Sequence, residues 1–186
     1  MSDTALLVID VQESFRYAPY WSDEDVAPFA LSLQRLIDGA ASRGLPVLQV
    51  FHTEETGHFS LASGHVRTLT PLAIRPDAVF HKRKHSALVG SGLDIWLTQH
   101  GTRRLIVCGI RTEQCCETTT RHASDRGWLV DYVTEATLTF AMTSAYGRRY
   151  TPAEIKAHTE LVLTGRFATI ATVEEALSSP ALSAAA

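Results

Sequence analysis

Short apolar runs alternate with longer amphipathic stretches along most of the chain. The runs are rich in Val, Ile and Leu and hold few polar residues, a pattern typical of strands buried on both faces. We expect strands at residues 5–11, 46–51, 78–81, 104–108, 129–133 and 168–171. Their alternation with helices predicts an α/β fold of three αβα layers, with a mostly parallel sheet and right-handed crossovers.

Apolar positions at helical spacing and capping residues predict the helices. Thr151 and Glu154 have the spacing of a capping box, and Pro152 suits the first helical position. Thr112 is placed to cap the helix that follows the fourth strand. Residues 53–76 show no clear period and are expected to form a long loop. The predicted helices cover residues 28–43, 93–99, 112–126, 152–165 and a segment that begins after residue 172.

Size and charge limit the classes of function. The chain has 186 residues, which fits one domain over residues 1–186, and its net charge is −3. The single basic cluster, residues 81–85, is too short for a nucleic-acid-binding face. No apolar run approaches the roughly 18 residues of a membrane span, and no basic region precedes the first run. We expect a cytoplasmic protein with a small-molecule substrate and with neither nucleic acid nor membrane as a partner.

Three reactive residues follow predicted strands. Asp10 lies at the end of the first strand, Lys82 follows the third, and Cys115 comes just after the fourth. Ligands of parallel sheets bind beyond the carboxyl ends of the strands. Cys115 is therefore a candidate nucleophile, with Asp10 as its proton acceptor and Lys82 stabilising the anion. Because Lys or Asp at a strand end is often only solvated, the spacing alone leaves this triad open.

The strand-to-helix turn adds two expectations. Backbone N–H groups between Arg111 and Cys115 are candidates for an oxyanion hole, and the first helical turn favours a thiolate. The other two cysteines, Cys108 and Cys116, are expected to be buried core residues. Three cysteines cannot form a disulfide framework.

Sequence motifs indicate a family. ALLVIDVQESF, HKRKHSAL and GIRTEQC occur in this order, and GRFATIATVEEAL follows near the C-terminus. They resemble the opening strand, the Lys-x-x-Tyr-Ser-Ala-Phe element and the Gly-Val-x-Thr-x-x-Cys motif of the isochorismatase-like cysteine hydrolases. That superfamily includes nicotinamidases, N-carbamoylsarcosine amidohydrolase and ureidoacrylate-type amidohydrolases. The resemblance implies a six-stranded parallel sheet, a triad of Asp10, Lys82 and Cys115, and a cis peptide between Ile110 and Arg111. It also implies a homo-oligomer, a dimer or a tetramer.

Departures from the family pattern concern the lysine element and the metal site. His85 and Leu88 replace the usual Tyr and Phe, which leaves Lys84 as a second candidate for the catalytic lysine. Nicotinamidases of the superfamily bind a divalent ion through Asp-x-His and a further His, but no Asp precedes His52 at that spacing. A combination of His52 and Glu54 with His58 or His65 would be an improvised alternative. We expect no metal and no cofactor.

The predicted activity is hydrolysis of a C–N bond in a small amide, carbamoyl or ureido compound through a thioester. Arg111 is either a ligand for a substrate carboxylate or a surface arginine. The other candidate pocket residues are Phe15, Trp21, His52 and His85. Two alternatives are isochorismate-type vinyl ether hydrolysis, which needs no thiol, and a non-catalytic thiol-sensing or binding module on the same fold. The presence of Cys115 argues against vinyl ether hydrolysis.

Overall fold

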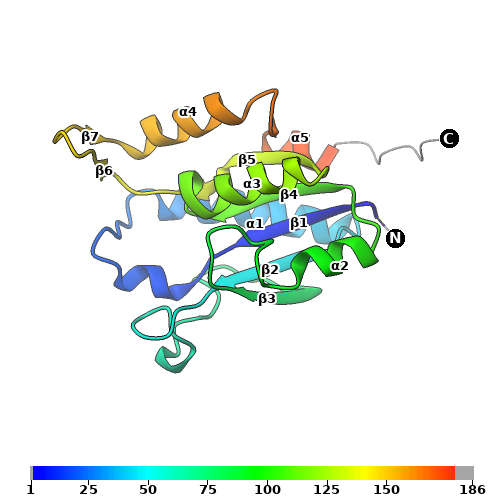
Figure 1. Ribbon diagram of the computed structural model, residues 1–186, viewed down its shortest axis with the longest axis horizontal. Coiled ribbons are helices and arrows are strands. Elements are labelled where there is room, and N and C mark those ends of the chain that lie inside the picture. The colour runs from blue at the N-terminus through cyan, green and yellow to red at the C-terminus, as the bar shows by residue number, and fades with distance from the viewer. Residues whose placement is uncertain (1, 179–186) are drawn as a thin grey trace.

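A six-stranded parallel sheet forms the centre of the molecule (Figure 1). The computed structural model describes residues 2–178. All five neighbouring strand pairs are parallel, which confirms the predicted fold class. From one edge to the other, the strands are β3 (Ala78–Lys82), β2 (Val47–His52), β1 (Thr4–Ile9), β4 (Arg104–Ile110), β5 (Leu129–Leu138) and β8 (Thr169–Ile170).

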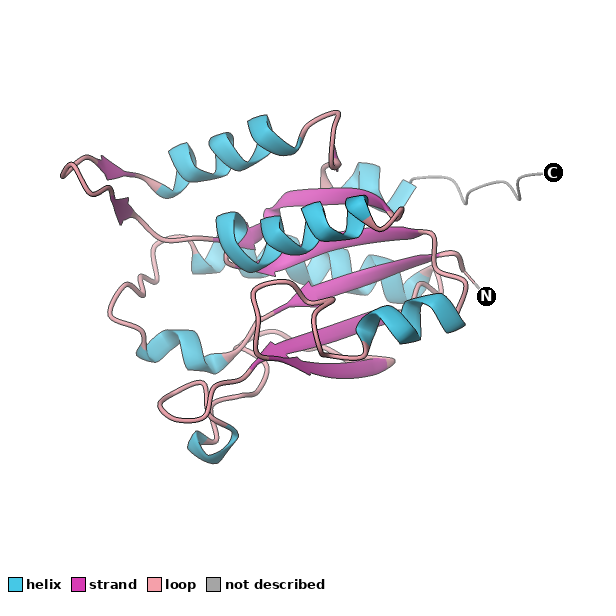
Figure 2. Ribbon diagram, viewed as in Figure 1, coloured by secondary structure: helices cyan, strands magenta, loops and turns pink. Residues whose placement is uncertain are grey.

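Helices cover both faces of this sheet (Figure 2). One face carries α1 (Val26–Ser42) and α5 (Val173–Ser178), and the other carries α2 (Leu93–Gln99) and α3 (Glu117–Asp125). A further helix, α4 (Pro152–Leu163), lies beside α3. No helix within residues 2–178 is long and apolar enough to cross a membrane.

The alternation of side chains along β1 divides the core into two layers. Leu6 and Val8 pack against the α1 layer, whereas Leu7 and Ile9 pack against the α2 and α3 layer. All four side chains are fully buried. Since burying one such side chain contributes about 1.5–3 kcal/mol, β1 is fixed at the centre of the sheet, and the residue after it is fixed with it.

Local structure differs from the prediction after β4. The expected helix 112–126 consists of a π-helical turn, η3 (Thr112–Cys116), followed by α3. Thr112 is not the helix cap, because η3 already begins at Thr112; its hydroxyl donates to Thr137 Oγ1 at 2.7 Å. Strand β5 continues five residues beyond the predicted end, past a register shift against β4 that lies between Val107 and Gly109.

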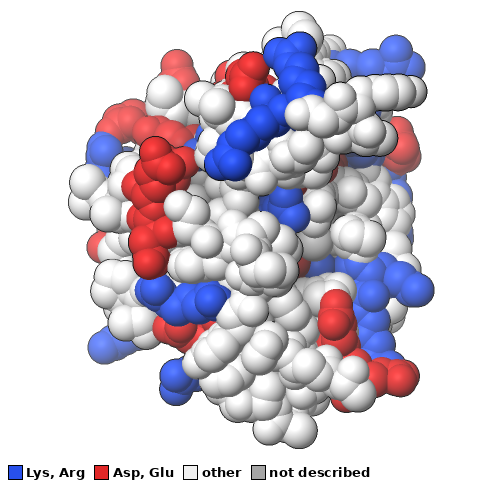
Figure 3. All heavy atoms as spheres, turned by 90° about the vertical axis from the view of Figure 1, so that its left-hand side faces the viewer, with Lys and Arg blue, Asp and Glu red and all other residues white. Residues whose placement is uncertain are grey.

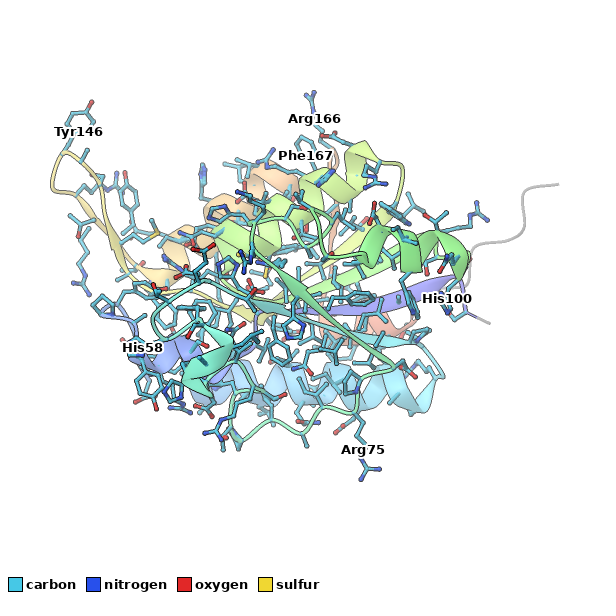
Figure 4. All side chains as sticks on the ribbon, turned by 60° about the horizontal axis from the view of Figure 1, so that its bottom comes forward. His58, Arg75, His100, Tyr146, Arg166 and Phe167 are labelled. Atoms are coloured by element: carbon cyan, nitrogen blue, oxygen red, sulfur yellow. The ribbon has the colours of Figure 1, made fainter. Side chains whose placement is uncertain are left out.

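Four short elements were not predicted. Strands β6 (Met142–Thr143) and β7 (Arg149–Tyr150) form an antiparallel ribbon. Tyr146, at its tip, is almost fully exposed and points away from the body (Figure 4). The loop 53–76 holds a 3-10 turn, η2 (Leu61–Ser63). Another 3-10 turn, η1 (Glu13–Tyr17), follows β1. These segments flank the carboxyl ends of the strands.

The capping box predicted for α4 is confirmed. The Thr151 hydroxyl accepts a hydrogen bond from the Glu154 N–H at 3.2 Å, and Glu154 Oε2 accepts one from the Thr151 N–H at 2.8 Å. This cap fixes where α4 begins, immediately after the β6–β7 ribbon.

Candidate active site

Three segments distant in sequence bring Asp10, Lys82 and Cys115 together at the carboxyl edge of the sheet. Lys82 Nζ lies 2.7 Å from Asp10 Oδ2 and 3.3 Å from Cys115 Sγ. The side chains of Asp10 and Lys82 have no exposed surface, and Cys115 retains 8% of its own. The lysine at the site is therefore Lys82, whereas Lys84 is exposed.

The backbone around these residues is unusual at two positions. Asp10 has a φ of 52°, a left-handed conformation that costs a non-glycine residue roughly 1 kcal/mol. Gly109 has a φ of 126°, and a Cβ there would collide with the Ile9 carbonyl. Glycine therefore permits the close approach of β4 to the end of β1. The expected cis peptide between Ile110 and Arg111 is present.

Burial dominates the electrostatics of the three groups. It raises the pKa of the Cys115 thiol to about 12, with Asp10 raising it further and Lys82 opposing the rise. The expectation of a favoured thiolate is thus overturned, since the thiol keeps its proton at neutral pH. Burial likewise raises the pKa of Asp10 against the opposing charge of Lys82. Burial disfavours the Lys82 ammonium, but Asp10 and Cys115 raise its pKa above the usual value.

The burial of the Cys115 thiol argues against the alternative function as a thiol sensor. Oxidants react with the thiolate, and burial, which raises the pKa of the Cys115 thiol to about 12, disfavours that form. Cys108 and Cys116 are fully buried, as expected. Burial also raises the pKa of each of their thiols. Sensing of oxidants by these cysteines is therefore disfavoured.

His52 is the third neighbour of the lysine. Its Nδ1 lies 3.3 Å from Lys82 Nζ, and its Nε2 lies 3.6 Å from Glu54 Oε1. Burial and the charge of Lys82 lower the pKa of His52, which keeps the ring neutral. The buried Gln12 fixes the residue through both backbone groups of His52, at 2.8 and 3.1 Å. Gln12 was not singled out from sequence, because nothing in its surroundings indicates which strand it reaches.

Arg111 is paired with Glu113, a residue that the sequence analysis did not select. Arg111 Nη2 lies 2.8 Å from Glu113 Oε1, and Thr139 Oγ1 donates to Glu113 Oε2 at 2.6 Å. The guanidinium also stacks on the rings of Tyr20, at 4.7 Å, and Phe140, at 5.9 Å. Arg111 is 7% exposed, so it is not a surface arginine.

The remaining predicted pocket residues are Phe15, Trp21 and His85. Phe15 is in the core and packs edge-on against Phe59, which in turn contacts His52. Trp21 packs on Phe140 at 5.3 Å and donates its N–H to Asp23. The His85 side chain is exposed. Of the predicted wall residues, His52 has a direct contact with the triad through Lys82.

The histidines of the 53–76 loop do not form the donor set that a divalent ion needs. His58 and His65 stack on Tyr17, with ring centroids 4.9 and 4.0 Å from the Tyr17 centroid. His58 projects at the end of the molecule that also carries the β6–β7 ribbon (Figure 4). Within residues 2–178 there is no group of three or more His, Cys, Asp or Glu side chains placed to share a metal. The residues present do not fit a nicotinamidase-type metal site.

The surface at the carboxyl ends of the strands carries charges of both signs (Figure 3). Acidic and basic side chains alternate there around a broad uncharged area. A cavity of about 540 Å³ in this region includes Tyr20, Thr139 and Phe140 in its lining. A second, of about 640 Å³, lies between the β6–β7 ribbon and α4 and reaches Glu113; Cys115 lines neither cavity.

Comparison with known proteins identifies the family. Residues 4–175 match the model of the isochorismatase domain, so the chain belongs to the isochorismatase family. Nicotinamidase 3 of Arabidopsis thaliana is 29% identical over 152 residues, covering 73% of each chain. YrdC, an isochorismatase family protein of Bacillus subtilis (strain 168), is 22% identical over 177 residues, covering 94% of each.

Solved structures agree with this assignment. A protein of the isochorismatase family from Chromobacterium violaceum ATCC 12472 superposes with a TM-score of 0.86 at 26% identity, covering 95% of this chain and 93% of its own. A cysteine hydrolase from Pseudomonas syringae pv. phaseolicola 1448A shares the fold, with a TM-score of 0.86 at 21% identity, covering 94% of this chain and 91% of its own. The chain is an isochorismatase-family hydrolase.

Proposed function

We propose that this chain is a cysteine-dependent hydrolase that cleaves a C–N bond in a small amide, carbamoyl or ureido substrate. The observation that carries the proposal is the position of Lys82 Nζ, in contact with both the Asp10 carboxylate and the Cys115 sulfur. A base, a cation and a nucleophile within hydrogen-bond reach are what thiol-mediated acyl transfer requires. The name of the Arabidopsis relative, a nicotinamidase, supports an amide as the target.

The first half of the reaction acylates the cysteine. Asp10 accepts the thiol proton while Cys115 Sγ attacks the substrate carbonyl carbon and the C–S bond forms. Because burial raises the pKa of the thiol and so disfavours a free thiolate, this proton transfer accompanies the attack. Backbone N–H groups of Arg111 and Cys115 hold the oxyanion. Asp10 then passes its proton to the leaving nitrogen, the C–N bond breaks, and a thioester remains.

The second half releases the acid. Asp10 takes a proton from a water molecule as the water oxygen attacks the thioester carbonyl. The C–S bond breaks, and the sulfur recovers its proton from Asp10. Lys82 stays charged throughout and offsets the negative charge that moves between the carboxylate and the sulfur.

Ammonia release tests the proposal. Nicotinamide and a panel of aliphatic amides and ureido acids are incubated with the wild type, with Cys115→Ser and with Cys116→Ala. The first substitution should abolish release, and the adjacent Cys116→Ala, which removes a fully buried sulfur, should retain it. Mass spectrometry of quenched wild-type reactions should show an acyl group on the peptide that contains Cys115.

Two outcomes would contradict the proposal. Amide hydrolysis that survives Cys115→Ser would remove the nucleophile from the mechanism. Cleavage of a vinyl ether such as isochorismate by both the wild type and Cys115→Ser, without amide hydrolysis, would instead support the alternative that needs no thiol.

A further inference from the structure

We propose that Glu113 determines the charge of the substrate: by neutralising Arg111, it makes the site select substrates that are uncharged next to the scissile carbonyl. Glu113 would act through Arg111 as a specificity-determining residue. This inference rests on the proposed function of Cys115 and adds a substrate class to it, neutral amides and ureas in place of carboxylate-bearing ones.

The Arg111–Glu113 pair is buried and tightly held. The two side chains expose 9% and 14% of their surface. Glu113 uses Oε1 for Arg111 and Oε2 for Thr139, so its orientation is fixed from two sides. The stacking of the guanidinium on Tyr20 and Phe140 prevents Arg111 from turning away.

Arg111 nevertheless keeps one hydrogen-bond donor unused. Its Nε is buried and has no hydrogen-bond partner among residues 2–178. A buried N–H without a partner is costly, and a ligand oxygen would satisfy it. Backbone geometry places Arg111 beside the thiol: the N–H of Cys116, the residue after Cys115, donates to the Arg111 carbonyl at 3.3 Å, and Tyr20 lies against the guanidinium at 4.7 Å. Arg111 and Cys115 therefore belong to the same turn at the carboxyl edge of the sheet.

The buried charges of the site cancel in pairs. Asp10 is compensated by Lys82, and Glu113 compensates Arg111. His52 is neutral because burial and Lys82 lower its pKa, and Glu54 is largely exposed to solvent. A substrate carboxylate at Arg111 would add a buried negative charge without a free partner, which is strongly disfavoured. A carbonyl, amide or hydroxyl oxygen could accept from Arg111 Nε without that penalty.

A pair of alkylating reagents tests this inference independently of the unknown substrate. Iodoacetamide is neutral and iodoacetate is anionic, and they are nearly the same size. In both cases the sulfur of Cys115 forms a bond to the methylene carbon, iodide leaves and the thiol proton is released. The measured quantity is the rate of alkylation of Cys115 by iodoacetate divided by the rate with iodoacetamide. Peptide mass spectrometry shows that the modification is on Cys115, and the ratio is then divided by the same ratio for N-acetylcysteine. Because both reagents attack the same thiol, its ionised fraction cancels.

Wild type should discriminate against iodoacetate relative to N-acetylcysteine. Glu113→Gln leaves Arg111 without its counter-charge and should shift the ratio toward iodoacetate by on the order of 10- to 100-fold. The double variant R111Q/E113Q, neutral at both positions, should return close to the wild-type ratio. It also keeps the test decisive if E113Q alone is unstable.

Glu117→Gln is the matched control. Glu117 is on the same helical segment and is also held by an arginine and a threonine, Arg121 at 3.0 Å and Thr159 at 3.0 Å. It should leave the ratio unchanged. A shift of less than threefold in E113Q, or the same shift in E117Q, would overturn the inference. Alkylation of wild-type Cys115 by iodoacetate at least as fast as by iodoacetamide, relative to N-acetylcysteine, would also overturn it.

Turnover separates this inference from the proposed function. If wild type hydrolyses carboxamides but not the matching carboxylates, and E113Q narrows that preference, both stand. If no amide is cleaved while the alkylation ratio still depends on Glu113, the charge selection stands and the hydrolase proposal fails.

Discussion

Removing one member of the Asp10–Lys82 pair should destabilise the protein far more than removing an exposed ion pair would. Both side chains are completely buried and their charged atoms are 2.7 Å apart. At an effective dielectric constant of about 20, charges at that distance attract by about 6 kcal/mol. Either Asp10→Asn or Lys82→Met leaves the other charge buried and unpaired, which should lower the free energy of unfolding by about 3–5 kcal/mol.

The double variant D10N/K82M tests whether the cost comes from the unpaired charge. Because it contains neither charge, it should lose at least about 2 kcal/mol less than the sum of the two single variants. Urea denaturation at pH 7.5, followed by tryptophan fluorescence and circular dichroism, gives the three values. Additivity within about 0.5 kcal/mol would refute the coupling.

The pH dependence of Lys82→Met supplies a second check. Burial already raises the pKa of Asp10, and the variant lacks the ammonium that opposes this rise. A carboxyl group whose pKa is higher in the folded than in the unfolded state binds more protons when folded, so stability falls as pH rises between the two values. K82M should therefore lose more stability between pH 5 and pH 8 than the wild type, and D10N/K82M should not show this extra loss. If stability falls with pH equally steeply in K82M and the wild type, the extra loss is not due to a raised pKa of Asp10.

Three further changes probe the surroundings of the site. His52→Leu removes a hydrogen-bond acceptor from Lys82 and should lower kcat/KM about tenfold. His52→Gln should retain most activity but, because it lacks an imidazole, should lose any acid limb of the pH–rate profile that is due to His52. Profiles that match the wild type in both variants would exclude a role for His52 in the reaction. Gly109→Ala places a methyl group against the Ile9 carbonyl and should lower Tm by several degrees or prevent soluble expression. An unchanged melting curve would show that β1 and β4 can move apart at this point. Thr151→Ala removes the cap of α4 and should lower the free energy of unfolding, measured by urea denaturation, by about 1 kcal/mol while leaving kcat unaffected. A loss of turnover without a loss of stability would contradict this purely structural role of Thr151.

The sequence predicted the sheet, and it selected three residues whose side chains the structure brings together. Apolar runs define parallel strands, and parallel strands place their carboxyl ends at one edge, which made Asp10, Lys82 and Cys115 candidates for one site. The strand order β3-β2-β1-β4, which the runs do not specify, is what brings the three side chains into contact. The resemblance to a known family pointed to the same three residues. His52 was selected only as a candidate pocket residue, and the structure places it at the end of β2, between the strands that lead to Asp10 and Lys82.

The Arg111–Glu113–Tyr20 arrangement could not be predicted in the same way. Residues two apart in a regular helix do not face one another, and η3 departs from an α-helix without a change in apolar period. Tyr20 comes from a loop about ninety residues away that has no regular secondary structure to place it. The β6–β7 ribbon has only two residues per strand, too few for an alternating pattern to be recognised.

The position of β3 has a consequence for how activity is lost. This strand is at the edge of the sheet and, within residues 2–178, pairs with β2 alone. It has exposed side chains at Val79 and His81, yet its last residue is the buried Lys82. Edge segments with few buried contacts open at lower free energy than the centre of a domain. Mild denaturant should therefore inactivate the molecule by peeling this strand away while the other strands and helices remain folded, so inactivation would precede global melting.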